Sequence, residues 1–275
     1  MINIFNYIER KSPIHNATGA TKLILFLLWS FAAMITYDTR VLLVLPVISV
    51  ALFAVSKIRL SDVRVMLIAT CIFMLLNNIL VFLFSPQHGC EIYGSRTVLF
   101  TIGGPYVVTK EQLFYHLNLF LKYLAQVPMI LLFVSTTQPS EFAASLNRIG
   151  VSYKISYAVA LALRYIPGLQ SDYVDISRSQ QARGVEMSKK ETLFKRLKAA
   201  GTIIIPLILS SMDRIDTISN AMELRGFGKG EKRSWYMARR FGKIDFFLIG
   251  LGLMLLAVVI ILFFVNGGRY YNPFV

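Results

Sequence analysis

The apolar stretch Ile244–Val265, with the sequence IDFFLIGLGLMLLAVVIILFFV, decides the fold class of this protein. Its single charged residue is Asp245, next to its start. A helix needs roughly 17 to 25 residues to cross the bilayer's hydrocarbon core of about 30 Å, and a long run without central charges is typical of such a span. We therefore predict that this stretch crosses a membrane.

Four further stretches have a comparable length and composition, and they lie near 21–38, 40–56, 65–85 and 113–135. The polar side chains of Asn77, Asn78 and Lys122 inside them would be costly against lipid, so we expect them to face other helices. The sequence therefore predicts an all-α polytopic membrane protein with about five transmembrane helices.

The composition supports a membrane protein and argues against several other classes. Of 275 residues, 55% are hydrophobic and 16% are charged, whereas a soluble domain carries roughly 25% charged residues. Disordered, collagen-like and disulfide-scaffold proteins are excluded on the same grounds. The two cysteines, Cys71 and Cys90, form no CxxC, and the three histidines are far apart in sequence. We expect no metal site, redox site or cofactor.

The positive charges are distributed unevenly between alternate connections. The connection 136–243 holds 18 of the 29 Lys and Arg residues, and the N-terminal segment and the second connection hold most of the others. By the positive-inside rule, we predict a cell-membrane protein whose N-terminus is cytoplasmic and whose C-terminus is outside. The formal net charge of +14 is then explained by the basic residues of the cytoplasmic segments. Nucleic-acid binding is not expected, because the basic segment lacks regularly interleaved aromatic residues.

These segments predict three parts of the chain. Residues 1–138 form a transmembrane bundle of four spans, residues 139–243 a cytoplasmic domain, and residues 244–275 the last transmembrane helix and an outer tail. Two short β-prone runs, Val98–Ile102 and Tyr106–Val108, flank Gly103-Gly104 and predict a small hairpin at the outer end of the bundle.

The cytoplasmic segment is too long for an idle loop, and it contains three helical pieces. They run over Glu141–Arg148, from about Ser152 to Arg183, and from about Ile203 to Arg225. The second and third pieces each have apolar residues at alternating steps of three and four, which places those residues on one helix face. The two apolar stripes consist of Ile155, Val159, Ala162, Ile166, Leu169, Tyr173 and Ile176, and of Ile204, Ile208, Ser211, Ile215, Ile218 and Met222. We predict amphipathic helices at the inner membrane surface.

The two long cytoplasmic helices end in similar sequences. The first ends in Gln181-Ala182-Arg183-Gly184 and the second in Glu223-Leu224-Arg225-Gly226. Glycine just past a helix is the usual left-handed terminator, and an arginine in the last turn complements the negative end of the helix dipole. Both ends are therefore consistent with ordinary caps. As a repeated pair, they are also suited to enter acidic grooves on a partner, where a guanidinium forms directional bidentate bonds.

Taken together, these residues resemble the transmembrane T component of energy-coupling-factor (ECF) transporters, which is similar to the cobalt-importer membrane subunit. The resemblance covers most of the chain, and its most specific part is a pair of Ala-Arg-Gly signatures. The first signature is intact, whereas the second has Leu224 in place of alanine. The other matching stretches are Ser12-Pro-Ile-His15, Thr136-Thr137 and Leu163-Arg-Tyr-Ile-Pro167.

The resemblance implies a non-catalytic coupling subunit of an ATP-driven importer of vitamins or transition-metal ions. In that family the two signatures dock onto two ATP-binding-cassette ATPases, which here implicates Ala182, Arg183, Gly184, Leu224, Arg225 and Gly226. The apolar faces of the coupling helices hold a small membrane-embedded substrate-binding subunit, which implicates Val159, Ile166, Ile215 and Ile218. The chain itself has no GxxxxGK[ST] phosphate loop, so the ATPase is expected in another chain.

Two alternatives remain open. One is a conventional importer permease of the ATP-binding-cassette class, because Glu141-Phe-Ala143-Ala144 followed by Gly150 loosely resembles the cytoplasmic loop of such permeases. The other is a membrane-embedded enzyme, because Asp172 and Asp175, and likewise Asp213 and Asp216, are spaced to share a helix face. We expect those carboxylates to be solvated or to pair with nearby arginines such as Arg214.

Overall fold

The computed structural model describes residues 10, 12–103, 106–185, 193–230, 234–236 and 238–274, without the side chains of Ile102 and residues 193–198. The start of the N-terminal segment and Gly104 of the predicted hairpin lie outside the described residues. The chain divides into two compact units, Met1–Glu141 together with Arg239–Val275, and Phe142–Ala238.

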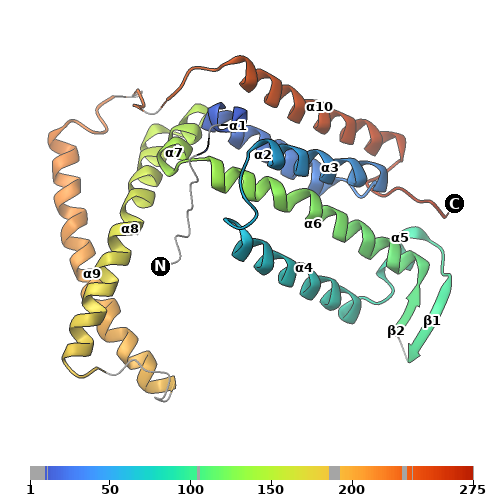
Figure 1. Ribbon diagram of the computed structural model, residues 1–275, viewed down its shortest axis with the longest axis horizontal. Coiled ribbons are helices and arrows are strands. Elements are labelled where there is room, and N and C mark those ends of the chain that lie inside the picture. Colours follow the sequence, from blue (N-terminus) through green and yellow to red (C-terminus); the bar gives the residue numbers. More distant parts are fainter. Residues whose placement is uncertain are drawn as a thin grey trace. The chain divides into compact units, whose positions relative to one another are not determined.

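The first unit is a helical bundle with one small sheet (Figure 1). The three longest apolar helices are α4, α6 and α10, each long enough to cross a membrane, and α2 and α3 are shorter apolar helices. These five helices confirm the five predicted apolar segments to within a few residues. The elements of this unit are α1 (Pro13–Asn16), α2 (Gly19–Ile35), α3 (Thr39–Val55), α4 (Arg64–Phe84), α5 (His88–Tyr93), β1 (Val98–Gly103), β2 (Tyr106–Thr109), α6 (Lys110–Thr136) and α10 (Lys243–Val265).

Side-chain caps set the starts of three of these helices. Thr18, Asp38 and Thr109 precede α2, α3 and α6, and each accepts a hydrogen bond from a backbone N–H in the first turn of its helix. These bonds satisfy amides that the helix itself leaves unpaired. Short side-chain acceptors therefore mark where the apolar runs become helical.

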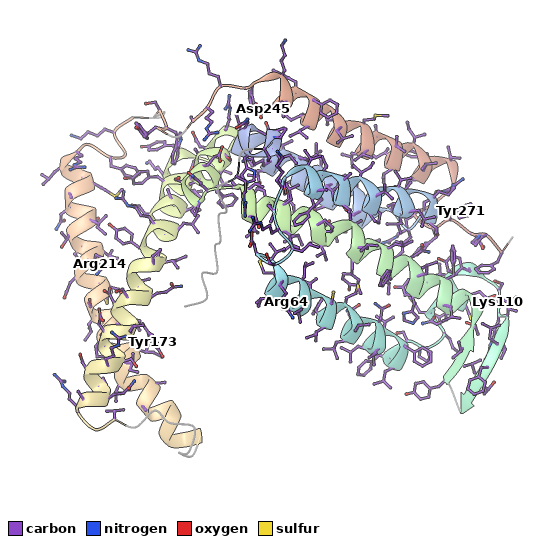
Figure 2. The ribbon with its side chains drawn as sticks, in the orientation of Figure 1. Arg64, Lys110, Tyr173, Arg214, Asp245 and Tyr271 are labelled. Atoms are coloured by element: carbon purple, nitrogen blue, oxygen red, sulfur yellow. The ribbon has the colours of Figure 1, made fainter. Side chains whose placement is uncertain are left out.

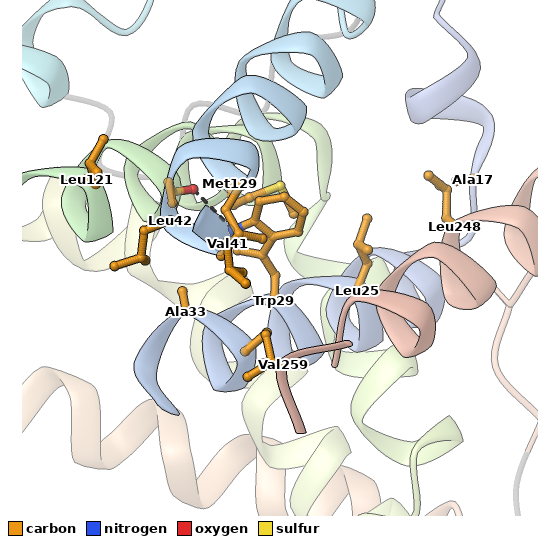
Figure 3. Close-up of a cluster of buried hydrophobic side chains, with 13 residues drawn as sticks. Ala17, Leu25, Trp29, Ala33, Val41, Leu42, Leu121, Met129, Leu248 and Val259 are labelled. Atoms are coloured by element: carbon orange, nitrogen blue, oxygen red, sulfur yellow. Dashed lines mark hydrogen bonds between the residues drawn. The ribbon is translucent and has the colours of Figure 1, made fainter. Parts of the chain in front are cut away.

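The core of the bundle is built around Trp29 of α2, which is fully buried (Figure 3). Its indole Nε1 donates a hydrogen bond of 3.1 Å to the carbonyl oxygen of Ala125 in α6. On another side, Gly252 of α10 lies so close to α2 that a Cβ there would be 3.0 Å from the Leu28 side chain. Small residues at such contacts let apolar helices pack closely.

Polar side chains join α4 and α6 within the apolar region. The Tyr123 hydroxyl donates to Asn77 Oδ1 at 2.8 Å, and Asn78 Oδ1 lies 3.1 Å from His116 Nδ1. Lys122 Nζ donates to the Met34 carbonyl oxygen at 3.0 Å. The prediction that Asn77, Asn78 and Lys122 face other helices is confirmed.

The predicted hairpin is also present, and it lies at one end of the bundle. Strands β1 and β2 pair antiparallel, with Phe100 opposite Val108 and Thr101 opposite Val107. The carboxylate of Glu111, in the first turn of α6, accepts hydrogen bonds of 3.0 Å from the backbone N–H of Thr97. The hairpin is thereby attached to the start of α6.

The C-terminal tail closes the turn between α2 and α3. The Tyr37 N–H donates to the carbonyl oxygen of Arg269 at 2.8 Å, and Asn266 Nδ2 donates to Asp38 Oδ2 at 2.8 Å. Burial raises the pKa of the Asp38 carboxyl, but hydrogen bonds from Arg40 and Asn266 outweigh it and leave the pKa below its ordinary value. This carboxylate therefore holds both the start of α3 and the tail.

The second unit contains the crossed helices α8 (Tyr153–Ala182) and α9 (Leu193–Leu224), which run antiparallel and pack against one another (Figure 1). Helix α7 (Pro139–Arg148) precedes them. The predicted start of the third helical piece at about Ile203 is ten residues late, and Pro206 lies inside α9. The upstream residues, rich in Leu, Lys, Arg and Ala, favour helix without contributing an apolar stripe.

Candidate functional site

The first Arg-Gly sequence forms the C-terminal end of α8. The N–H of Gly184 donates to the Gln181 carbonyl and that of Val185 to the Gln180 carbonyl, both at 3.0 Å. Gly184 has a φ of +86°, a left-handed conformation that side-chain-bearing residues rarely adopt. These bonds are those of a Schellman motif, with Arg183 as the C-cap residue.

The second Arg-Gly sequence ends α9 in the same way. The N–H of Gly226 donates to the Glu223 carbonyl at 2.8 Å and that of Phe227 to the Met222 carbonyl at 2.9 Å, with a φ of +67° at Gly226. Arg225 therefore occupies the position that Arg183 occupies in α8. The likeness between the two ends extends from the sequence to the backbone.

A third helix end shows that this cap does not need an arginine. Helix α7 closes with the same pair of hydrogen bonds, from Gly150 to Asn147 at 3.2 Å and from Val151 to Leu146 at 3.0 Å. The residue at the C-cap position there is Ile149, followed by Gly150 with a φ of +109°. The left-handed glycine makes the cap, so the arginines at the other two ends are not required for it.

The residues of both Arg-Gly ends are largely accessible. Ala182, Arg183 and Gly184 are exposed, and so are Arg225 and Leu224, the latter to 89%. Leu224 therefore presents a large apolar side chain where a signature alanine would present a small one. Because α8 and α9 are antiparallel, the two ends lie at opposite ends of the crossed pair (Figure 1).

The apolar stripes of α8 and α9 line a common groove of about 800 Å³. The groove includes Ile166, Ile215 and Ile218, three of the four side chains predicted to contact a substrate-binding subunit. Val159 is not among the lining residues, because the groove begins at Leu161. The other lining residues from the two stripes are Ala162, Leu169, Ser211 and Met222.

An ion pair links α8 and α9 beside the groove. Arg214 Nη2 of α9 donates to Asp172 Oδ2 of α8 at 2.9 Å, and Figure 2 shows Arg214 near Tyr173, the residue after Asp172. The prediction that an aspartate here pairs with Arg214 is confirmed. Asp213 and Asp216 are exposed, and the described residues contain no group of His, Cys, Asp and Glu that could hold a metal ion.

A buried polar network lies at the start of α2, within the first unit. Asp245, labelled in Figure 2, accepts hydrogen bonds of 2.7 Å from the backbone N–H groups of Thr18 and Gly242. Glu141 Oε1 accepts from the Gly19 N–H at 2.9 Å, and its Oε2 lies 3.8 Å from Lys22 Nζ. The sequence did not bring these residues together. An acidic residue at the start of an apolar run, as at Asp245, is the signal that points to such a contact.

Comparisons with known proteins agree with this architecture. A sequence model of the cobalt transport protein family, CbiQ, matches residues 10–236. A Leuconostoc gelidum subsp. gasicomitatum protein named energy-coupling factor transporter transmembrane protein EcfT is 29% identical over 180 residues, covering 62% of this chain and 63% of that protein. The chain thus spans less than two thirds of that relative's length.

Two other relatives align over almost their whole length. The protein with the same name from Lactococcus lactis subsp. cremoris is 27% identical, with 93% of this chain and 95% of the relative covered. The Listeria monocytogenes protein named energy-coupling factor transporter transmembrane protein EcfT 1 is 26% identical, with 91% and 96% covered. The similarity therefore includes both the apolar helices and the crossed pair.

Proposed function

The chain belongs to the cobalt transport protein family, CbiQ, and from this membership we propose that it is the energy-coupling membrane subunit of an ATP-driven importer of the ECF type. The cargo class is a vitamin or a transition-metal ion. The chain transmits motion and does not itself perform chemistry. ATP hydrolysis is assigned to two partner ATPases of the ATP-binding-cassette class, and cargo binding to a small membrane-embedded subunit.

The observation that carries this proposal is the pair of arginine-bearing helix ends. Arg183 and Arg225 occupy equivalent positions in two identical Schellman caps, although the cap of α7 forms with Ile149. Both arginines are exposed, at opposite ends of the crossed helices. Two cationic ends held apart on rigid helices suit two separate acidic grooves, one on each ATPase, where a guanidinium bonds bidentately to carboxylates.

The groove between α8 and α9 supports the second partner. Ile215 lines it and is 61% exposed, and exposed apolar surface of this kind marks interaction sites. We assign this groove, with Ile166 and Ile218, to the substrate-binding subunit. Displacement of either helix end by an ATPase would alter the angle between α8 and α9 and hence the surface offered to that subunit.

The docking of the ATPases is tested by reversing both charges. In an Arg183→Glu/Arg225→Glu double variant, two attractive contacts become repulsive, and we expect each loss to cost roughly 2–5 kcal/mol of binding. Affinity purification of the subunit in mild detergent should then recover the substrate-binding subunit but not the ATPases, and transport should be abolished.

Two matched variants distinguish the effect of losing the arginine charges from the effect of disturbing the helix ends. Arg183→Ile/Arg225→Ile places at both ends the residue that α7 carries at the same position, so the caps should persist while the ATPases are still lost. Arg178→Glu reverses an exposed charge on α8 away from its end, and it should retain the ATPases. Normal ATPase recovery with the double glutamate variant would refute the proposal. Failure to recover any small substrate-binding subunit with the unmodified chain would favour a conventional permease.

A further inference from the structure

A cluster of aromatic side chains ties the end of α9 to the start of α8. The Phe227 ring lies 4.9 Å from the Tyr157 ring and 5.7 Å from the Tyr153 ring, centroid to centroid. The Trp235 ring lies 6.3 Å from the Tyr157 ring. We call Tyr153, Tyr157, Phe227 and Trp235 the aromatic clasp. All four belong to the second unit.

The clasp also reaches α7 through a hydrogen bond. Trp235 Nε1 donates to Asn147 Oδ1 at 3.0 Å, and Asn147 Nδ2 donates to the Val151 carbonyl oxygen at 2.9 Å. Asn147 belongs to α7, and Val151 lies in the turn between α7 and α8. The indole therefore has both a ring contact with α8 and a directional bond to the preceding helix. Trp235 is half-buried, and this hydrogen bond of its N–H fixes the direction in which the indole lies.

The clasp acts directly on the second arginine-bearing end. Phe227 is two residues after Arg225, and its N–H makes the longer-range hydrogen bond of the Schellman cap, to Met222. Its backbone is thus part of the helix end that presents Arg225, while its ring is packed on Tyr153 and Tyr157 of α8. Phe227 therefore connects the helix end that carries Arg225 to the start of α8.

We infer that the aromatic clasp is the positioning device that transmits displacement of the Arg225 end to α7 and α8. This inference rests on the proposed function, because it takes an ATPase to be the source of the displacement. Without the clasp, displacement of Arg225 would move the end of α9 and the segment after it relative to α8, and α8 would stay in place. With it, the end of α9 and the start of α8 move as one body. ATP hydrolysis is thereby coupled to a change in the groove.

The experiment uses the complete reconstituted complex with ATPases and the substrate-binding subunit. Phe227→Leu and Phe227→Ala remove the ring, and Trp235→Phe removes the hydrogen bond to Asn147 while keeping an aromatic side chain. Tyr236→Ala is the matched control, since Tyr236 is a neighbouring aromatic residue that is 100% exposed. Because Phe227 also lines the groove, four quantities are measured for each variant in proteoliposomes: recovery of the ATPases, recovery of the substrate-binding subunit, rate of ATP hydrolysis, and uptake per ATP hydrolysed.

We expect the Phe227 variants to retain the ATPases, the substrate-binding subunit and the hydrolysis rate but to lose roughly tenfold in uptake per ATP, within the usual range of coupling between distant sites. Trp235→Phe should lose less, and Tyr236→Ala nothing. Unchanged uptake per ATP in Phe227→Ala would overturn the inference. Loss of the ATPases from both Phe227 variants would overturn it too, because the clasp would then be needed for docking and not for transmission. Loss of the substrate-binding subunit from both variants would overturn the inference, because Phe227 would then act in binding and not in transmission. The docking proposal fails on a different result, which is ATPase recovery with the double glutamate variant.

A distance measurement tests the mechanical step without relying on transport. Spin labels at Lys154→Cys and Lys229→Cys, in a chain whose Cys71 and Cys90 are replaced, report the separation between the start of α8 and the segment after α9. The distance distribution should be narrow in the complex and with Tyr236→Ala, and broad with Phe227→Leu. A distribution that stays equally narrow after removal of the Phe227 ring would contradict the inference.

Discussion

At the scale of single residues, carboxylates at helix starts do more than cap their own helices. Asp245 accepts one hydrogen bond from Gly242, in front of its own helix α10, and another from Thr18, 227 positions away in the sequence. Glu141 likewise accepts from Gly19 at the start of α2. Both carboxylates therefore satisfy backbone amides of helix N-termini, where negative charge is also favoured by the helix dipole. Asp245 and Glu141 thus connect the starts of α10 and α7 to the start of α2.

This arrangement predicts the effect of Asp245→Asn. Two backbone N–H groups point at the two carboxylate oxygens, so an amide would direct its NH₂ group at one of these donors and leave that donor unsatisfied. We expect a loss of about 1–3 kcal/mol in the free energy of unfolding. The measurement is the thermal midpoint of the purified subunit in detergent. Asp62→Asn provides a comparison, because Asp62 pairs with the partly exposed Arg10 at 3.4 Å and accepts a hydrogen bond from the exposed hydroxyl of the adjacent Ser61, and exposed pairs of this kind contribute little. Equal midpoints for the two variants would contradict this account.

At the scale of secondary-structure elements, the crossed pair α8 and α9 shows why two amphipathic stripes do not bury one another. The helices are linked by the ion pair of Arg214 and Asp172, but beyond their contact the stripes diverge and leave the groove open. Ile208 is 52% exposed and Ile215 is 61% exposed. Exposure of so much apolar surface to water is unfavourable. An apolar partner surface in the groove would remove this surface from water.

A polar residue in the groove should weaken the attachment of the substrate-binding subunit. Burying an isoleucine side chain is worth about 1.5–3 kcal/mol, so Ile215→Gln should lower the affinity about tenfold or more. The readout is the amount of substrate-binding subunit, relative to the ATPases, in the purified complex.

The matched control for Ile215→Gln is Met212→Gln. Met212 lies on the same helix, is 56% exposed and does not line the groove. The ATPases should be retained in both variants, and only Ile215→Gln should lose the substrate-binding subunit. If both variants, or neither, lose it, the groove is not the contact surface.

At the scale of the whole molecule, the chain combines an apolar bundle with a unit of different composition. The bundle exposes large apolar side chains along α4, which has no fully buried residue, as expected of a helix that faces lipid. The second unit carries most of the basic residues together with the two arginine-bearing ends. We propose that this unit is cytoplasmic and that the hairpin is on the outer side, because the short connections follow the positive-inside rule.

The proposed topology is tested by labelling introduced cysteines from one side of the membrane. In a chain with Cys71 and Cys90 replaced, Arg96→Cys lies before the hairpin and Arg59→Cys in the connection between α3 and α4, and both positions are exposed. A membrane-impermeant maleimide added to intact cells should label Arg96→Cys only. Arg59→Cys should react once the cells are opened. The opposite pattern would show that the chain is inserted in the reverse orientation.

Much of the architecture follows from local patterns. The five apolar segments, the hairpin and the two Arg-Gly helix ends depend on hydrophobicity, strand propensity and the conformation of glycine, which are properties of neighbouring residues. The predicted start of α9 is wrong by ten residues, because residues 193–202 favour helix but lack the apolar stripe from which the helix was predicted. The docking roles of Arg183 and Arg225 stay predictions.

The sequence alone determined that this chain is a helical membrane protein with two stripes and two cationic helix ends, because period and composition are visible residue by residue. Only the tertiary structure decided that Ile166 and Ile215 share one groove while Val159 lies beyond it, that Asp245 holds the start of α2, and that Phe227 packs on Tyr153 and Tyr157. These are contacts between residues tens to hundreds of positions apart. Such contacts depend on the crossing angle of the helices and on which helix faces meet. A pattern of neighbouring residues predicts neither the angle nor the pairing of faces.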